Sequence, residues 1–390
     1  GDPLTAHDAA FTHNLFLEQG IPDYARAVKQ RIKSVEVIDD HTLRYDFVDG
    51  ISRRSLISQV GGNAVFSKKW YEETGERLDK PSLLSPMASG PYMLDDYEIN
   101  RYVIYRRNPD YWGWHLPINK GRHNFDVVRF DYYTDANTEF QGFTSGEYTF
   151  RAEGNSKRWV NGYDFPNVEN GSVVLEELPD QTPPTPRGFV FNTLRPIFED
   201  RTVREALSLA FNFEWTQESL QNGVTSQFSS FTEGSPLEAK GLPEGAEKAF
   251  LESLGDVVPP EVFTEEAVVS HTSNPRQGDR LEPVDRRNKR RALGLLETAG
   301  WVAGSDGKLR NEAGDLLAFE IMISSSTDDE DEAIITNYVS NLNEFGASVT
   351  VEKIDTNQWS QRYYDKDFDM VLFRYGTLLT VGTGLNQMFG

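Results

Sequence analysis

The residue of this 390-residue chain with the most suggestive chemistry is Arg374, which follows the apolar run at 370–373. A guanidinium group is a planar fork of N–H donors, and it can bind a carboxylate or a phosphate-like group through two parallel hydrogen bonds. Tyr375 and Gly376 follow directly. This combination predicts an anion-binding position beside an aromatic ring. Because the formal net charge is -22, the alternative is a structural ion pair with one of the many acidic side chains.

A second group of candidate contacts lies in the segment 153–166, which is polar and aromatic with little periodicity. This segment is either a solvent loop or a crossover that faces a cleft and offers Asn155, Lys157 and Trp159 to a ligand. In the second case, Trp159 and Tyr375 would stack along the ligand. Asn192 is a further candidate, because it ends a short apolar strand where its amide could meet a ligand's main chain.

The motifs give little support to an enzyme. The chain has no cysteine, which excludes thiolate nucleophiles, disulfides and cysteine-ligated metals. It has no G-x-S-x-G, H-E-x-x-H or P-loop motif. A secreted glycoside hydrolase is an alternative that would need two carboxylates flanking a cleft, but nothing singles out a pair among 61 acidic residues. We therefore expect a binding protein without a catalytic centre or a cofactor.

Histidine spacing and net charge narrow the range of ligands. His7 and His13 are six residues apart, so they do not share a helical face as ligands at i and i+4 would. The other four histidines are scattered, and a metal-chelate receptor is a weak alternative. The negative charge argues against nucleic acid or anionic lipid as a partner. The basic residues at 286–291 fit the solvated face of a helix better.

The elements that would position these residues are organised around residues 188–215. Residues 188–192 are short, apolar and aromatic, as in a buried strand. Asp200 stands where a helix cap belongs. Beyond it, apolar residues recur at helical spacing: Val203, Ala206, Leu207, Ala210 and Phe211. A stiff Pro-rich connector at 182–186 leads into the strand.

The rest of the chain alternates between helical and strand patterns, which predicts an α/β fold of two or three domains. Helices are expected at 5–20, 136–146, 286–299, 328–345 and 358–364. Strands and hairpins are expected at 32–47, 92–107, 125–133, 173–178, 304–317, 319–325, 348–354 and 368–373. Residues 241–274 give no clear signal. The acidic run at 328–332 would open a helix, whose positive end favours negative charge without a calcium site. No run of eighteen apolar residues is present.

Several segments, in order along the chain, resemble the family 5 extracellular solute-binding proteins, the receptors of peptide and nickel ABC importers. Within that family the likeness is to the oligopeptide and microcin C binding branch. The central segment carries Arg195-Pro196 and then Phe198-Glu199-Asp200. Further family-like motifs are SGPY at 89–92, NPDYWG at 108–113, ALGLLETAGW at 292–301 and FDM at 368–370.

This resemblance implies a two-lobed periplasmic binding protein fold with an extra small domain, truncated at both ends. Residues 1–85 would be the remainder of the small domain, 86–187 part of lobe I, and 188–390 lobe II. The lobes would close over an oligopeptide or a peptide-like compound and deliver it to the permease subunits of an ABC importer. We expect a monomer in the periplasm, or an extracytoplasmic membrane-associated protein, with its signal peptide outside this sequence.

One departure from the family pattern concerns the ligand's amino group. In classical oligopeptide and dipeptide receptors, an aspartate shortly after the FD strand pairs with the free α-amino group of the peptide. Residues 372–380, LFRYGTLLT, contain no acid, and TVGTG at 380–384 replaces the SPGNE-like continuation. A free amino terminus would therefore be held differently here, or not at all.

Overall fold

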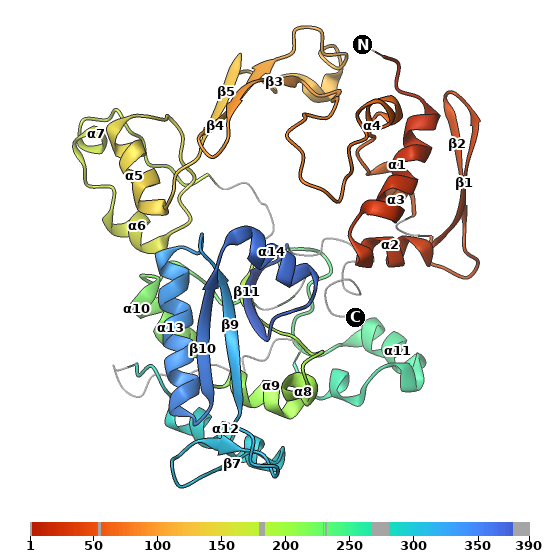
Figure 1. Cartoon of the computed structure of the whole chain (residues 1–390). Helices are drawn as coiled ribbons and strands as arrows, with labels where there is room; N and C mark the ends of the chain where they lie inside the picture. Colours follow the sequence, from red (N-terminus) through yellow and green to blue (C-terminus); the bar gives the residue numbers. More distant parts are fainter. Residues whose placement is uncertain are drawn as a thin grey trace. The chain divides into compact units, whose positions relative to one another are not determined.

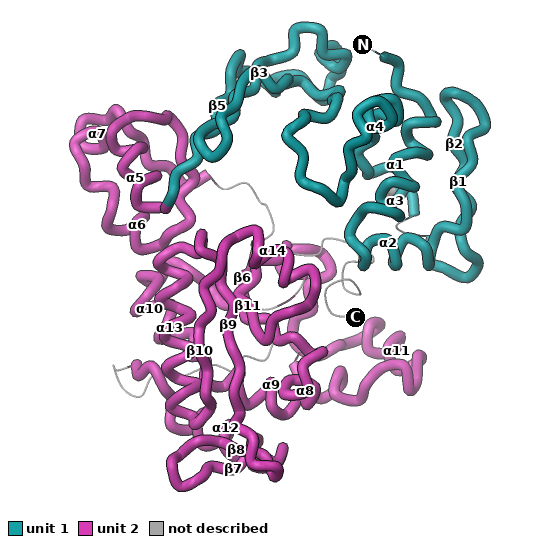
Figure 2. The backbone as a smooth tube through the Cα atoms, viewed as in Figure 1, with its two compact units in different colours: residues 1–134, 380–390 teal, residues 135–379 magenta. Residues whose placement is uncertain are grey.

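The computed structural model describes residues 2–53, 56–178, 184–228, 230, 232–266 and 281–376. The chain forms two compact units (Figure 2). Unit 1 comprises residues 1–134 and 380–390, and unit 2 comprises residues 135–379. The boundary at 134 lies inside the predicted lobe I segment of 86–187, and the division into lobes at 85 and 187 stays a prediction.

The first part of unit 1 packs four helices with a β-hairpin (Figure 1). The helices are α1 (Ala6–Gln19), α2 (Pro22–Lys29), α3 (Leu56–Gly61) and α4 (Lys68–Thr74), and the hairpin is β1 (Ile32–Asp39) with β2 (Thr42–Phe47). Asp8 accepts a hydrogen bond from the main-chain N–H of Thr5 at 2.9 Å, which closes the start of α1. The predicted helix at 5–20 and the predicted hairpin at 32–47 are thus confirmed.

The second part of unit 1 is an antiparallel sheet of three strands, in the order β3 (Tyr92–Glu98), β4 (Tyr102–Arg107) and β5 (Val127–Asp131). A short 3-10 helix, η1 (Pro117–Asn119), lies in the connection between β4 and β5. Arg107 places its guanidinium 4.2 Å from the centre of the Trp114 ring, a cation–π contact. The predicted strands at 92–107 and 125–133 are confirmed.

Unit 2 is built on a sheet with the strand order β10 (Ser348–Ile354), β9 (Ala318–Ser324), β11 (Met370–Arg374) and β6 (Arg187–Phe191). β9 runs parallel to β10 and to β11, whereas β11 and β6 are antiparallel. The crossovers are α13 (Asp329–Glu344) between β9 and β10, and α14 (Thr356–Tyr364) between β10 and β11. This βαβ arrangement is the α/β lobe that the sequence predicts.

The main core of unit 2 lies between one face of the sheet and several helices. These are α8 (Pro196–Glu199), α9 (Arg201–Ser208), α12 (Arg286–Thr298) and α13. Phe198, Leu207, Leu296 and Ile321 are fully buried there. A smaller cluster around Met322, with side chains of α14, covers the other face. The sheet is therefore apolar on both sides, as expected for parallel pairing.

The central helix begins as predicted but ends earlier. Asp200 accepts a hydrogen bond from the N–H of Thr202 at 2.7 Å and so caps α9. The helix ends at Ser208, and Asn212 caps a new helix, α10 (Phe213–Leu220), by accepting from the N–H of Trp215 at 3.0 Å. The apolar stripe at 203–211 therefore spans one helix and a turn, because a second capping residue interrupts it.

Three further regions correct or extend the sequence-based picture. The strand predicted at 173–178 is wrong: this segment is irregular and mostly exposed, and it pairs with no strand in the described part of the chain. Residues 153–166 contain α6 (Ser156–Asn161), between α5 (Ala136–Ser145) and α7 (Pro166–Glu169). The region without a clear signal contains α11 (Gly245–Ser253) and two 3-10 turns, η2 (Gly255–Val257) and η3 (Pro260–Phe263).

The predicted hairpin at 304–317 has very short strands, β7 (Val302–Ala303) and β8 (Leu309–Arg310), which pair antiparallel. Gly307 adopts a positive φ of 73° in its turn, a conformation that glycine adopts without steric cost. Among the described helices, none is long and apolar enough to cross a membrane.

Candidate functional site

A cavity of about 1150 Å³ lies in unit 2 beside strand β6. Its walls come from residues 150–156, strand β6, helix α10 with the loop after it, the start of α13 and the end of β11. Aromatic rings form much of the lining: Phe150, Trp159, Phe189, Phe191, Phe211, Phe213, Phe228, Tyr338 and Tyr375. Apolar walls with a few polar groups are typical of ligand sites, and this volume is at the upper end for drug-sized ligands.

Four of the six predicted contact residues line this cavity. Asn155 and Trp159 come from α6 and its cap, and Arg374 and Tyr375 come from the end of β11 and the residue after it. The structure thus brings two distant segments of the chain to one cavity. Lys157 instead lines a smaller neighbouring cavity of about 200 Å³, which shares Asn155 with the larger one.

Asn192 is not among the residues that line either cavity. Its side-chain amide donates to the carbonyl oxygens of Lys366 at 2.9 Å and Phe368 at 2.7 Å, and its Oδ1 accepts from the N–H of Leu194 at 3.1 Å. The side chain is buried. These contacts give Asn192 a structural place at the end of β6, where it ties the chain before β11 to the chain after β6.

Arg374 ends strand β11, and 52% of its side chain is exposed. Its Nη2 lies 3.5 Å from Oδ2 of Asp331. This is the structural ion pair that the sequence left open as an alternative. Arg374 also lines the cavity, and half of its side chain is exposed, so a ligand in the cavity can reach it.

Tyr375 is held next to Arg374 by its main chain and its ring. Its N–H donates to the carbonyl of Pro186 at 3.0 Å, and its ring centre lies 6.0 Å from that of Phe228 in an edge-on contact. Burial raises the pKa of Tyr375 above its ordinary value, so the hydroxyl stays protonated at neutral pH and can donate a hydrogen bond.

A buried charge cluster forms one wall of the cavity. Arg187, the first residue of β6, donates from Nη2 to Oε1 of Glu330 at 2.6 Å and from Nη1 to Oδ1 of Asp331. Glu330 also accepts from the N–H of Ser156 at 2.7 Å, from its hydroxyl at 2.6 Å, and from Nε2 of Gln221 at 3.1 Å. The cluster therefore joins β6, α6, α10 and α13.

The two carboxyl groups of this cluster differ in their pKa. Burial acts to raise the pKa of Glu330, but the hydrogen bonds from Ser156, Arg187 and Gln221 lower it below its ordinary value. Burial raises the pKa of Asp331 although Arg187 and Arg374 act in the opposite sense. The surroundings thus stabilise the charged form of Glu330 and make the charged form of Asp331 less favourable.

The prediction that the acidic run at 328–332 opens a helix is confirmed, and two of its residues have a further role that the sequence did not indicate. Glu330 and Asp331 are buried, and each lies four positions before a buried isoleucine of α13, Ile334 or Ile335. Residues four apart share a helical face, so this spacing is a signal of burial that the charge pattern obscured. Asp328 caps α13 by accepting from the N–H of Asp331 at 2.8 Å, as expected for an acid at the positive end of a helix.

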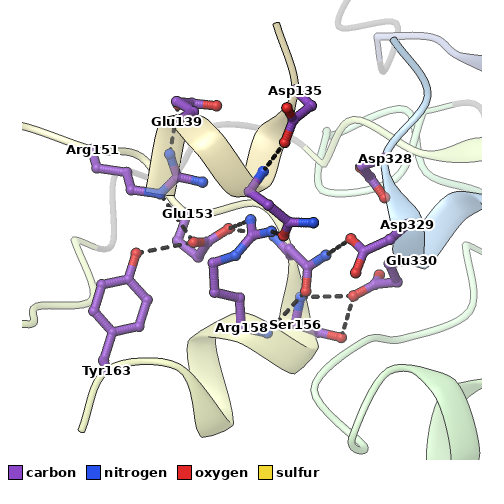
Figure 3. A network of polar contacts seen from close by, with 12 residues as sticks. Asp135, Glu139, Arg151, Glu153, Ser156, Arg158, Tyr163, Asp328, Asp329 and Glu330 are labelled. Atoms are coloured by element: carbon purple, nitrogen blue, oxygen red, sulfur yellow. Dashed lines mark hydrogen bonds and ion pairs between the residues drawn. The ribbon is translucent and has the colours of Figure 1, made fainter. Parts of the chain in front are cut away.

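A second polar network positions the segment 150–161 (Figure 3). Arg151 donates to Glu139 at 2.5 Å and to Glu153 at 3.1 Å, and the hydroxyl of Tyr163 donates to Glu153 at 2.9 Å. Burial and then the bond to Glu153 raise the pKa of Tyr163 to about 12. The amide of Asn155 donates to Asp329 at 2.9 Å. The network thereby fixes the cap of α6 against the start of α13.

Among the described residues, no group of three or more histidine, aspartate or glutamate side chains could hold a metal ion. The arginines of the cavity wall, Arg151, Arg187 and Arg374, are each paired with a carboxylate, and Glu176, Glu177 and Glu233 add further acidic side chains to the lining. What the arrangement offers to a ligand is aromatic surface, hydrogen-bond donors and the exposed part of Arg374.

Comparisons with known proteins place the chain in a family. Residues 1–389 match the model described as bacterial extracellular solute-binding proteins, family 5 middle. The chain belongs to this family. It is 31% identical over 371 residues to the uncharacterized protein YejA of Escherichia coli, covering 95% of this chain and 59% of that protein. It is 33% identical to the probable peptide-binding protein YejA of Agrobacterium fabrum, covering 100% of this chain and 62% of that protein.

The chain therefore spans less than two thirds of the length of these two family members. Among solved structures, the oligopeptide-binding protein AppA of Bacillus subtilis, bound to a nonapeptide, matches with a TM-score of 0.67 and 18% identity, covering 100% of this chain and 69% of AppA. A Thermotoga maritima oligopeptide-binding protein bound to mannohexaose matches with a TM-score of 0.67 and 17% identity, covering 100% of this chain and 66% of that protein. These likenesses confirm the two-lobed α/β fold of the family.

Proposed function

We propose that this chain is part of the ligand-capturing receptor of an ABC importer and that it binds oligopeptides or peptide-like compounds. The observation that carries the proposal is the large aromatic-lined cavity beside β6, with the half-exposed Arg374 at its wall. Two relatives are in agreement by description, since one is a probable peptide-binding protein and the other was solved with a nonapeptide.

The edge of the sheet supports an extended peptide as ligand. β6 is the last strand in the sheet order, so its outer edge pairs with no other strand of the described chain. Asn192 donates its N–H to Asp369, and Tyr375 donates its N–H to Pro186. Because main-chain groups alternate between the two edges of a strand, those of Phe189 point to the open edge. An extended peptide would add there as a further strand.

The side chains of the cavity suggest how such a peptide is oriented. Arg374 would bind its carboxylate, and Trp159 and Tyr375 would stack along flat parts of the ligand. Within the described residues of the segment after the FD strand, 372–376, no acid is available for a free α-amino group; residues 377–380 lie outside the described part. Asn155 would act mainly by fixing α6, since its amide already binds Asp329.

As in the receptors this family is known for, the protein would act outside the cytoplasmic membrane. We propose a monomer that delivers its ligand to membrane permease subunits, without chemical conversion of the ligand. A microcin-like peptide falls within the same ligand class. The alternatives are a metal-chelate receptor, in agreement with the Campylobacter jejuni relative NikZ solved with Ni(L-His) (TM-score 0.62, 16% identity, covering 97% of this chain and 63% of NikZ), and a glycoside hydrolase.

The test compares three ligand classes on the full-length protein. Its melting temperature would be measured with a random tetrapeptide pool, with manno-oligosaccharides and with nickel plus L-histidine. Stabilisation by the peptides at concentrations where the other two have no effect supports the proposal, since a ligand that binds the folded state raises the melting temperature. Stabilisation by the sugar or the nickel complex alone, or hydrolysis of the sugar, contradicts it.

A further inference from the structure

The ion pair between Arg374 and Asp331 indicates how the site selects its ligand. We propose that Asp331 is a specificity-determining residue that competes with the ligand for Arg374, so that a compound with a free carboxylate binds by displacing an internal one. This inference rests on the proposed function, because it concerns the same cavity. It assigns a role to a buried acid that does not itself line the cavity.

The two partners of the ion pair are held very differently. Only 11% of the Asp331 side chain is exposed, and Arg187 binds its Oδ1. Burial and the bond to Arg187 therefore restrict the movement of the carboxylate. Arg374 is 52% exposed, and its Nη2 lies 3.5 Å from Oδ2 of Asp331. The arginine is therefore the partner that can turn toward a ligand.

The charges of the cluster balance before a ligand arrives. Arg187 and Arg374 supply two positive charges, and Glu330 and Asp331 supply two negative charges. A ligand carboxylate on Arg374 would make a third anion next to two cations. Like charges at such distances repel, and the repulsion is larger in a partly buried site than in water. Asp331 therefore reduces the affinity for a carboxylate ligand without blocking it.

The two acids of the cluster differ in how well their surroundings stabilise the charged carboxylate. Glu330 has four hydrogen-bond contacts from Ser156, Arg187 and Gln221 and stays anionic. Asp331 faces Arg187 and Arg374, with the acids Asp328 and Glu330 nearby, and burial makes its charged form less favourable. When a ligand carboxylate binds Arg374, Asp331 loses its favourable electrostatic interaction with that arginine. An amidated or otherwise neutral ligand end would not cause this loss.

The substitution Asp331→Asn tests this competition, because it keeps the size of the side chain and removes its charge. We expect the affinity for free-acid peptides to rise about three- to tenfold, as for a partly exposed ion pair that no longer competes. The affinity for the same peptides with amidated C-termini should stay unchanged. Glu332→Gln is the matched control, since it removes the same charge one residue further along α13, from a carboxylate that pairs at the surface with Lys353.

The measurement is equilibrium binding of a random tetrapeptide pool and its amidated counterpart to the full-length protein, with bound peptides quantified by mass spectrometry. In an Arg374→Ala background, Asp331→Asn should no longer change the affinity for acids. That result, together with the selective gain in the single variant, supports the inference.

Two other outcomes would refute the inference, and only the second would also refute the proposed function. If the wild type binds peptides but Asp331→Asn changes acid and amide binding equally, or if its effect persists without Arg374, the competition is refuted while peptide capture stands. If no variant and no wild-type protein binds either pool, the proposed function fails, and the inference fails with it. Melting curves of Asp331→Asn would be compared with those of Glu332→Gln to ensure that folded protein is assayed.

Discussion

The two ends of strand β6 are both tied to neighbouring elements, but by different chemistry. At one end, the neutral amide of Asn192 binds the main-chain carbonyls of Lys366 and Phe368, away from the cavity lining. At the other end, Arg187 binds Glu330 and Asp331 at the cavity wall. Arg374 also forms an ion pair with Asp331, and half of the Arg374 side chain is exposed. The side chain at the neutral end has no hydrogen-bond donor left for a ligand, whereas at the charged end the exposed part of Arg374 can still bind one.

This difference separates stability from binding along one strand. A buried amide with all its partners in the main chain contributes by satisfying polar groups in the fold. A cluster of charges beside a cavity can exchange one partner for a ligand group. A substitution at the neutral end that changes binding, or one of Arg374 that changes only stability, would refute this comparison. The following predictions are ordered by the size of the expected effect.

The largest effect is expected for Glu330→Ala. It removes the acceptor of Arg187, Ser156 and Gln221 and leaves a largely buried guanidinium with one anionic partner fewer. Removing one partner of a buried pair is strongly destabilising, and we expect a loss of about 3 kcal/mol in the free energy of unfolding. Urea denaturation measures it. Glu332→Ala, on the same helix but paired at the surface with Lys353, is the control, and an equal loss in both would refute the account of the cluster.

A somewhat smaller loss is expected for Asn192→Ala. It removes three hydrogen bonds at a buried site, although the carbonyl of Phe368 keeps Arg195 as a donor. We expect a loss of about 2 kcal/mol in stability. Peptide affinity should stay unchanged. The sequence alone predicted weaker binding with little loss of stability, so calorimetric titration and denaturation of one variant decide between the two. Asn161→Ala, at an exposed position of α6, is the control.

The lowered pKa of Glu330 gives a prediction for pH. A carboxyl group whose pKa is lower in the folded state stabilises the fold above its ordinary pKa of 4.5, and this contribution is lost as the pH falls through the folded value. The free energy of unfolding of the wild type should therefore fall more steeply below pH 4.5 than that of Glu330→Gln. We expect the difference between the two proteins to grow as the pH falls below 4.5. Parallel slopes would mean that Glu330 is not the acid-sensitive group.

Much of the fold could be predicted because its signals are local. The apolar strand at 188–192, the alternation of β9, α13 and β10, and the cap at Asp200 are all visible within short windows of sequence. Helix α11 was missed because it is short and polar, and residues 173–178 have strand-like alternation without a partner strand. Pairing depends on the whole fold, which local patterns do not contain.

The candidate site shows the same limit. Arg374 and Trp159 were found because an arginine at a strand end and a tryptophan in a polar segment are unusual. The role of Arg187 could not be found, because its partners Glu330 and Asp331 lie more than 140 residues further along the chain. The missed residues are those whose function depends on long-range contacts with buried charge.

The central claim is that the charged end of β6 presents Arg374 to a ligand carboxylate. Calorimetric titration of the wild type, Arg374→Lys and Arg374→Ala, with a peptide that binds the wild type and with its C-terminal amide, tests it most directly. We predict that the wild type binds the acid more tightly than the amide, and that Arg374→Ala loses about 1 to 2 kcal/mol for the acid alone, with Arg374→Lys in between. Equal affinity of the wild type for acid and amide would contradict the claim.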